Sequence, residues 1–117
     1  MRIRPEEEIT DLGRVLRALR EKDRISVAEQ AEKYGLTTGF ISRNSNGTAL
    51  FSSSTVVKII EMYSDDEDVQ KDLAIAWVKQ YQTLRNLPLP KTTREALMAA
   101  SFLLGVDFEQ EKEKSVV

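Results

Sequence analysis

A short run of hydroxyl, glycyl and guanidinium groups is the part of this chain best suited to specific chemistry. Thr38 and Ser42 are four positions apart, as are Gly39 and Arg43, so a helix would carry them on one face. Hydroxyl groups and a forked guanidinium can hydrogen-bond base edges or phosphate oxygens without any covalent step. The chemistry that these residues predict is therefore recognition of a polar, anionic partner.

The sequence offers few residues suited to catalysis or metal binding. The chain of 117 residues has no cysteine and no histidine, which excludes disulfides, thiolate or imidazole metal sites and Cys- or His-based nucleophiles. Carboxylates cluster at 65–68, but consecutive acids before a helix are ordinary partners of its positive end and point in different directions. We expect no metal site, no cofactor and no enzymatic activity.

The elements that must position these residues begin at Ser26. Ser26 and Glu29 have the spacing of a capping box, which starts a helix. Ala31 is small enough for a second helix to cross closely, Gly35 can turn the chain in the left-handed conformation, and Ile41 would root the second helix in a core. This spacing predicts two short helices at a sharp turn, the second over about 37–46 and ended at Gly47.

The flanking sequence predicts further helices and no strand. Pro5 followed by three glutamates marks a helix start, and Ser52, Ser53 or Ser54 can cap a strongly apolar helix. Ser64 with Glu67, and Thr92 with Glu95, have the capping-box spacing again. We expect these helices over about 5–22, 52–63, 64–84 and 93–104, with the string NLPLP separating the last two.

Charge is distributed unevenly along the chain. The net charge of the whole chain is −2, which argues mildly against nucleic-acid binding because phosphate contacts drive affinity. Residues 1–60 nevertheless carry a net +2 and residues 61–117 a net −4, and no carboxylate occurs between Glu32 and Glu61. A window without acids suits a surface that approaches phosphate. The alternative is that this window is simply a polar loop rich in Ser, Thr, Asn and Gly.

The order of these elements resembles the lambda-repressor-like fold, also called the Cro-type or XRE family of helix-turn-helix proteins. The strings LGRVLRALREKDRIS, AEQAEKYGLTTGFISR and VVKIIEMY are similar to its first helix, its helix-turn-helix and its fourth helix. The resemblance covers about Leu12 to Tyr63. It departs from the family at Asn44, where an apolar residue is usual, and at Gly39, which costs a helix about 1 kcal/mol relative to alanine.

The resemblance implies a set of DNA-binding residues. The major groove would be faced by Thr37, Thr38, Gly39, Ser42 and Arg43, and Arg43 is the first choice for a guanine or phosphate contact. Asn46 and Thr48 could hydrogen-bond phosphates from the following loop. Capping of the helix is the alternative role for Thr37.

The second half of the chain holds more apolar surface than two extra helices on a small core would hide. We expect a homodimer interface there, because two-fold pairing doubles the contacts to a palindromic site. The residues expected in that interface are Trp77, Tyr81, Leu97, Phe102 and Leu103. Closure of one larger monomeric core is the alternative.

Taken together, the sequence predicts an all-α protein with three parts. Residues 1–63 are expected to form the helix-turn-helix domain, 64–105 a helical dimerisation extension, and 106–117 a charged tail without fixed structure. We expect a cytoplasmic regulator of phage, mobile-element or bacterial type, most simply a repressor, that binds double-stranded DNA as a dimer and does not engage membranes. The alternative is an antitoxin- or antirepressor-type module that binds a protein partner through its C-terminal helices.

Overall fold

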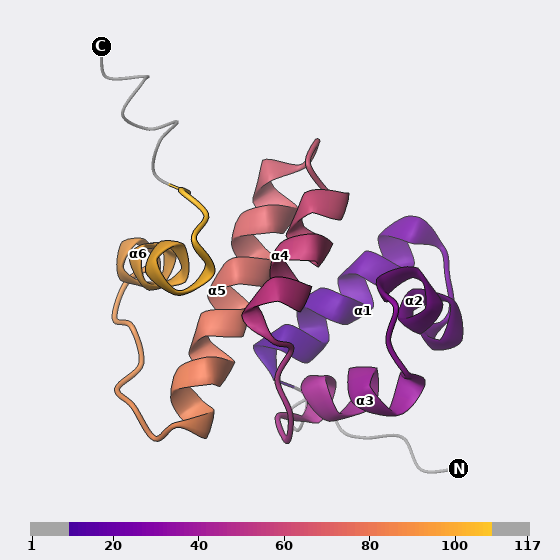
Figure 1. Ribbon diagram of the computed structural model, residues 1–117, viewed down its shortest axis with the longest axis horizontal. Coiled ribbons are helices and arrows are strands. Elements are labelled where there is room, and N and C mark those ends of the chain that lie inside the picture. Colours follow the sequence, from indigo (N-terminus) through magenta and orange to yellow (C-terminus); the bar gives the residue numbers. More distant parts are fainter. Residues whose placement is uncertain (1–9, 109–117) are drawn as a thin grey trace. The chain divides into compact units, whose positions relative to one another are not determined.

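Six helices make up the regular structure of residues 10–108, the part of the chain that the computed structural model describes (Figure 1). No strand occurs in this part, so the prediction of an all-α protein is confirmed. The helices are α1 (Asp11–Asp23), α2 (Val27–Tyr34), α3 (Thr38–Asn46), α4 (Ser53–Met62), α5 (Glu67–Leu84) and α6 (Thr93–Leu104).

The chain forms two compact units that divide between Leu50 and Phe51. The first unit contains α1, α2 and α3. The second contains α4, α5 and α6, and α4 contacts both α5 and α6. The structure thus groups α4 with the C-terminal helices, whereas the sequence suggested a division after residue 63. The assignment of residues 1–63 to DNA binding and of 64–105 to dimerisation stays a prediction.

The first helix begins later than the sequence suggests. Thr10 has an extended backbone, with φ −72° and ψ 170°, and its side chain accepts a hydrogen bond from the backbone N–H of Gly13. Thr10 is therefore the N-cap of α1, and a continuous helix from residue 5 through this point is wrong. The expected start at Pro5 itself lies outside the described residues.

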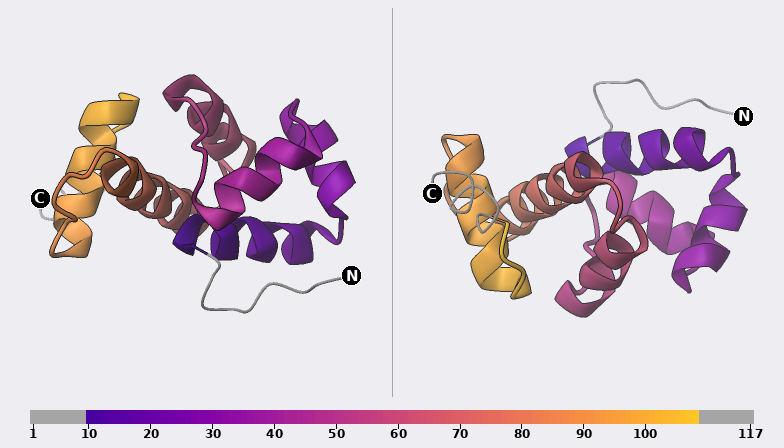
Figure 2. Two further views of the ribbon diagram at one scale, coloured as in Figure 1. Left: turned by 90° about the horizontal axis from the view of Figure 1, so that it is seen from below. Right: turned by 90° about the horizontal axis from the view of Figure 1, so that it is seen from above.

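Leucines spaced along α1 supply one side of the core in the first unit. Leu12 and Leu16 are fully buried, and α3 packs against both α1 and α2. Figure 2 shows α3 beside α1 in both of its views. Ala31 of α2 is only 3% exposed, and Ile41 of α3 is buried as expected.

A buried amide that was not predicted from the sequence joins α2 to α1. Gln30 is fully buried, and its Nε2 donates to the carbonyl oxygen of Leu16 at 3.0 Å and to the hydroxyl of Tyr34 at 3.4 Å. Its Oε1 accepts from the guanidinium of Arg20 at 3.0 Å. Burial, and then the charge of Arg17, lower the pKa of Arg20. The amide is thus satisfied at both ends, as a buried polar group must be.

The second unit is built on α5, which packs against α4 and α6. Leu73 and Val78 of α5 are fully buried. The indole Nε1 of Trp77 donates to the carbonyl oxygen of Phe51 at 2.9 Å, which ties the start of this unit to the middle of α5. In both views of Figure 2, α6 crosses α5.

Two of the expected capping arrangements in this unit differ in detail. The N-cap of α5 is Asp66, whose side chain accepts from the N–H of Val69, so the expected box starting at Ser64 is wrong. Thr92 does cap α6 by accepting from the N–H of Glu95, but the carboxylate of Glu95 accepts from Lys91 instead of Thr92. Either acceptor satisfies an amide at the helix start.

Candidate nucleic-acid interface

Local capping sets where α3 begins and ends. Gly35 has φ 74° in the left-handed region, which glycine adopts without steric cost, and it closes α2 as predicted. The hydroxyl of Thr37 accepts from the N–H of Phe40 at 3.1 Å, so Thr37 is the N-cap of α3. Gly47, at φ 88°, is the C-cap, as expected.

One side of α3 is anchored in the first unit. Ile41 is 1% exposed and Asn44 is fully buried. Asn44 satisfies its amide within the helix by donating from Nδ2 to the carbonyl oxygen of Phe40 at 2.9 Å. A polar residue is therefore accommodated at this buried position, and α3 continues to Asn46.

The opposite side of α3 is open to solvent. Thr38, Gly39, Ser42 and Arg43 are all exposed. The guanidinium carbon of Arg43 lies 5.7 Å from the centroid of the Phe40 ring, a cation–π distance that orients the long side chain along the helix. A Cβ placed on Gly39 would lie 3.4 Å from this guanidinium, so the two residues are neighbours on one exposed face.

The loop after α3 is held by two of the predicted phosphate ligands. The Oδ1 of Asn46 accepts from both the backbone N–H of Thr48, at 3.1 Å, and its hydroxyl, at 2.7 Å. The Thr48 N–H also donates to the carbonyl oxygen of Arg43. Asn46 and Thr48 thus stabilise the end of α3, and this internal bonding leaves them weaker candidates for phosphate than the sequence suggested.

The sequence window that contains α3 has few charges, and all of them are positive. Carboxylates are absent from residues 33–60, which include all of α3 and the loop that follows it. Lys33, which lies inside this window, forms an ion pair with Asp23 at 2.8 Å, so part of its charge is offset. Arg43 is therefore the principal cation of the exposed face in the described part of the chain.

The residues predicted for a dimer interface differ in how far they are exposed. Trp77 and Leu97 are 3% and 7% exposed and belong to the interior of the second unit. Tyr81 and Leu103 are half-buried, and Tyr81 stacks on Trp77 with 5.3 Å between ring centroids. Phe102, in contrast, is 87% exposed. Of these five residues, Phe102 is thus the one whose side chain is largely exposed and open to a partner.

Residues 105–108 follow α6, and the structure describes them. Gly105 ends the helix as expected, and the N–H of Phe108 donates to the hydroxyl oxygen of Ser101 at 3.3 Å. The remainder of the tail, residues 109–117, lies outside the described residues. Across residues 10–108 no cluster of acids forms a metal site, and no helix there has the length and apolar character needed to cross a membrane.

Comparison with protein-family models, with curated proteins and with solved structures finds no match for this chain.

Proposed function

We propose that the protein is a sequence-specific DNA-binding transcriptional regulator of the lambda-repressor-like helix-turn-helix class, most simply a repressor acting on a palindromic operator. The observation that carries the proposal is the two-sided character of α3. Its inner side is anchored by Ile41 and Asn44, while its outer side presents two hydroxyls, a bare glycine backbone and Arg43 without any nearby acid in the sequence. An exposed, rigidly held helix of this kind suits the major groove.

Each residue on the outer side has a defined part in this proposal. Arg43 reads guanine through the O6 and N7 atoms or contacts phosphate, because its fork fits either acceptor pair. Thr38 and Ser42 donate to base edges or phosphates, and Gly39 lets the backbone approach closely. Thr37 keeps α3 in place as its cap and stays a secondary candidate for a contact.

The experiment that tests this proposal is selection of binding sites from random duplex DNA, followed by titration of the selected duplex. Because a dimer on a palindromic operator carries Arg43 in both half-sites, Arg43→Ala should weaken binding by about 2–6 kcal/mol, or about 30-fold or more, at about 1–3 kcal/mol for each base-reading arginine. A base contact would also relax the sequence preference at one position of each half-site, whereas a phosphate contact would lower the salt slope by about one for each half-site.

Arg85→Ala is the matched control for this titration. Arg85 is also exposed and also lies over an aromatic ring of its own helix, at 4.1 Å from the Tyr81 centroid, but it belongs to the second unit. Its loss removes the same charge and should leave binding within about twofold. If Arg43→Ala binds the selected duplex as tightly as the parent at moderate salt, the assignment of α3 to the groove is overturned.

The alternative function is a protein-interaction module of the antitoxin or antirepressor type. The exposure of Met98 and Phe102, one turn apart on α6, favours it, because adjoining exposed apolar side chains form a patch of the kind that marks interaction sites. A selection that recovers no preferred DNA sequence, combined with intact folding, would favour this alternative over the regulator.

A further inference from the structure

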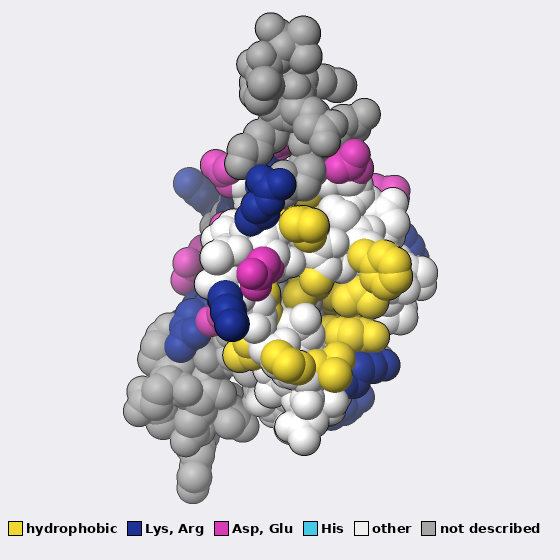
Figure 3. Space-filling view, turned by 90° about the vertical axis from the view of Figure 1, so that its left-hand side faces the viewer, with side chains coloured by type: hydrophobic (Ala, Val, Ile, Leu, Met, Phe, Trp, Pro, Cys, Tyr) yellow, Lys and Arg dark blue, Asp and Glu magenta, His cyan; other side chains and the backbone are white. Residues whose placement is uncertain are grey.

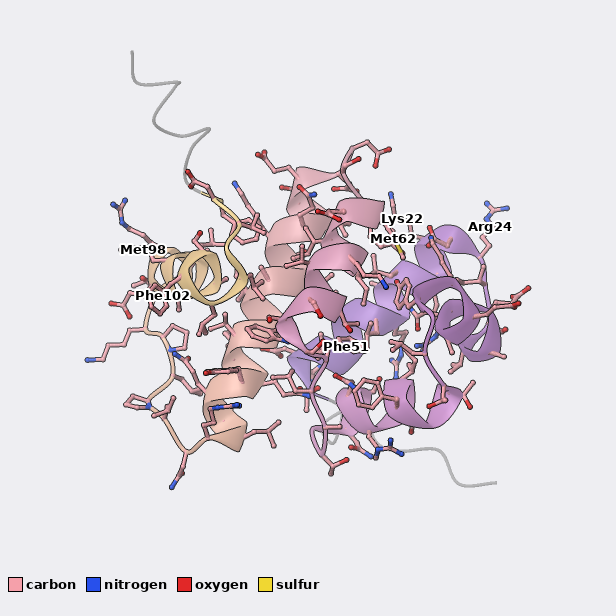
Figure 4. All side chains as sticks on the ribbon, viewed as in Figure 1. Lys22, Arg24, Phe51, Met62, Met98 and Phe102 are labelled. Atoms are coloured by element: carbon pink, nitrogen blue, oxygen red, sulfur yellow. The ribbon has the colours of Figure 1, made fainter. Side chains whose placement is uncertain are left out.

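An exposed stripe on α6 has a spacing that is symmetric about its own centre. Met98 is 53% exposed and Phe102 is 87% exposed, and both side chains lie on the side of α6 that faces away from α5 (Figure 4). Arg94, four residues before Met98, is also exposed. A cation thus stands one turn before Met98 and an aromatic ring one turn after it, on the same helical face.

We propose that a second copy of this chain covers the stripe, with the two α6 helices antiparallel and a two-fold axis beside Met98. In this arrangement each Met98 contacts its counterpart, and the ring of each Phe102 lies against the guanidinium of the partner's Arg94. Arginine over an aromatic ring is a favourable electrostatic pair. A two-fold interface requires a self-complementary surface, and this stripe has one.

The charges on α6 select the antiparallel orientation. A parallel pairing about the same stripe would place each Arg94 against its own copy, and like charges facing each other oppose association. The antiparallel pairing replaces that repulsion with two cation–π contacts.

Apolar side chains next to α6 enlarge the surface that such a pair would bury. Leu87 and Leu89, in the connection between α5 and α6, are 48% and 53% exposed, and hydrophobic side chains gather on this face in Figure 3. The interior residues Trp77 and Leu97 are not part of the interface proposed here, since the second unit already buries them. The pairing does not rest on DNA binding, although in a regulator it would supply the second α3.

The test measures the mass of the full chain in solution by sedimentation equilibrium over a range of concentrations. The parent should dimerise, and Phe102→Ser should raise the dimer dissociation constant by about 100-fold, because the dimer loses the contact between Phe102 and Arg94 at both ends of the stripe, each worth about tenfold. Circular dichroism of Phe102→Ser should match the parent, since an 87% exposed side chain contributes little to the fold of one copy. Urea unfolding should match at protein concentrations low enough for the parent to be monomeric, because dimerisation itself adds stability at higher concentrations.

A charge exchange tests the register. F102R should abolish the dimer by placing two guanidinium groups against each other at both ends of the stripe, and R94E combined with F102R should restore it through two pairs of opposite charge. Glu95→Ala, at an exposed neighbour of Arg94 that does not face Phe102 in this register, is the control and should leave the mass unchanged.

Cysteine cross-linking tests the position of the axis, because the chain has no cysteine of its own. Met98→Cys should be joined into a covalent dimer by a short bismaleimide, whereas Ser64→Cys, an isosteric change at an exposed turn of the same unit, should not. A monomeric parent up to the order of 100 μM, a dimer that F102R does not affect, or equal cross-linking of both variants would overturn the proposal. Arg43→Ala should stay dimeric, which separates failure of this pairing from failure of the proposed DNA binding.

Discussion

The carbonyl oxygen of Ser45 accepts two hydrogen bonds from Thr10, one from its backbone N–H at 3.1 Å and one from its hydroxyl at 3.0 Å. The same hydroxyl oxygen accepts from Gly13 and so caps α1. One side chain therefore starts α1 and fastens the end of α3 to it. Gly47 lies close by, where a Cβ would be only 3.0 Å from the methyl group of Thr10.

Thr10→Ala should therefore cost more than the loss of a simple cap. Removing an N-cap hydroxyl costs about 1 kcal/mol, and the lost bond to the Ser45 carbonyl adds about 0.5–1.5 kcal/mol. Thr92→Ala is the control, because the described contacts of the Thr92 hydroxyl are those of a cap alone. Urea unfolding measures both. Equal losses for the two variants would show that the contact with Ser45 contributes nothing to stability.

The contrast between these two threonines shows what could be predicted from sequence. The capping box at Ser26, the turn at Gly35 and the end of α3 at Gly47 depend on residues close together in the chain, and all three are confirmed. The start of α1 at Thr10 was missed because the bond that favours it comes from Ser45, thirty-five positions away. The Pro-Glu-Glu-Glu run also offered a stronger local signal.

The candidate site divides in the same way. The exposure of Thr38 and Ser42 follows from helical periodicity once Ile41 is assigned to the core. The bonds of Asn46 to Thr48, and the burial of Trp77, depend on loop geometry and on how α5 packs, neither of which periodicity determines. The sequence shows which apolar residues an amphipathic helix carries. It does not show whether other helices of the same unit bury those residues or leave them exposed.

Gln30→Ala should strongly destabilise the first unit. The change removes a buried amide that hydrogen-bonds to the Leu16 carbonyl and to Arg20. Both of these groups lose that partner, and the smaller side chain leaves a cavity. We expect a loss of about 2–4 kcal/mol in the free energy of unfolding. The measurement is urea unfolding followed by circular dichroism. Glu29→Ala is a useful comparison, because it removes only an exposed half of the capping box and should cost about 1 kcal/mol or less.

Gly39→Ala should stabilise the fold while weakening DNA binding. Alanine is favoured over glycine within a helix by about 1 kcal/mol, and the added Cβ meets only the flexible end of Arg43 at 3.4 Å. Under the proposed function, however, the new methyl group projects from the face that approaches DNA. A higher urea midpoint with a lower affinity for the selected duplex is the expected result. Unchanged affinity would place Gly39 away from the contact.

Asp72 gives a prediction for the dependence of stability on pH. Burial raises the pKa of Asp72, and the charges of Asp68, one turn earlier, and Asp66 raise it further. A carboxyl whose pKa is higher in the folded state binds its proton more tightly there, so its charge opposes folding at neutral pH. This penalty disappears as the pH falls below the pKa of the unfolded state, near 4.

Asp72→Asn should therefore raise stability at pH 7 by about 0.2–0.5 kcal/mol, the size of a like-charge pair one turn apart on a helix. The gain should shrink towards zero between about pH 5 and pH 3, since both proteins are then neutral at this position. Asp65→Asn is the control, because it removes a carboxylate that precedes α5 and suits the positive end of that helix. The measurement is the urea midpoint of each variant across this pH range. A gain in stability for Asp72→Asn that persists at pH 3 would show that the charge of Asp72 does not cause the gain.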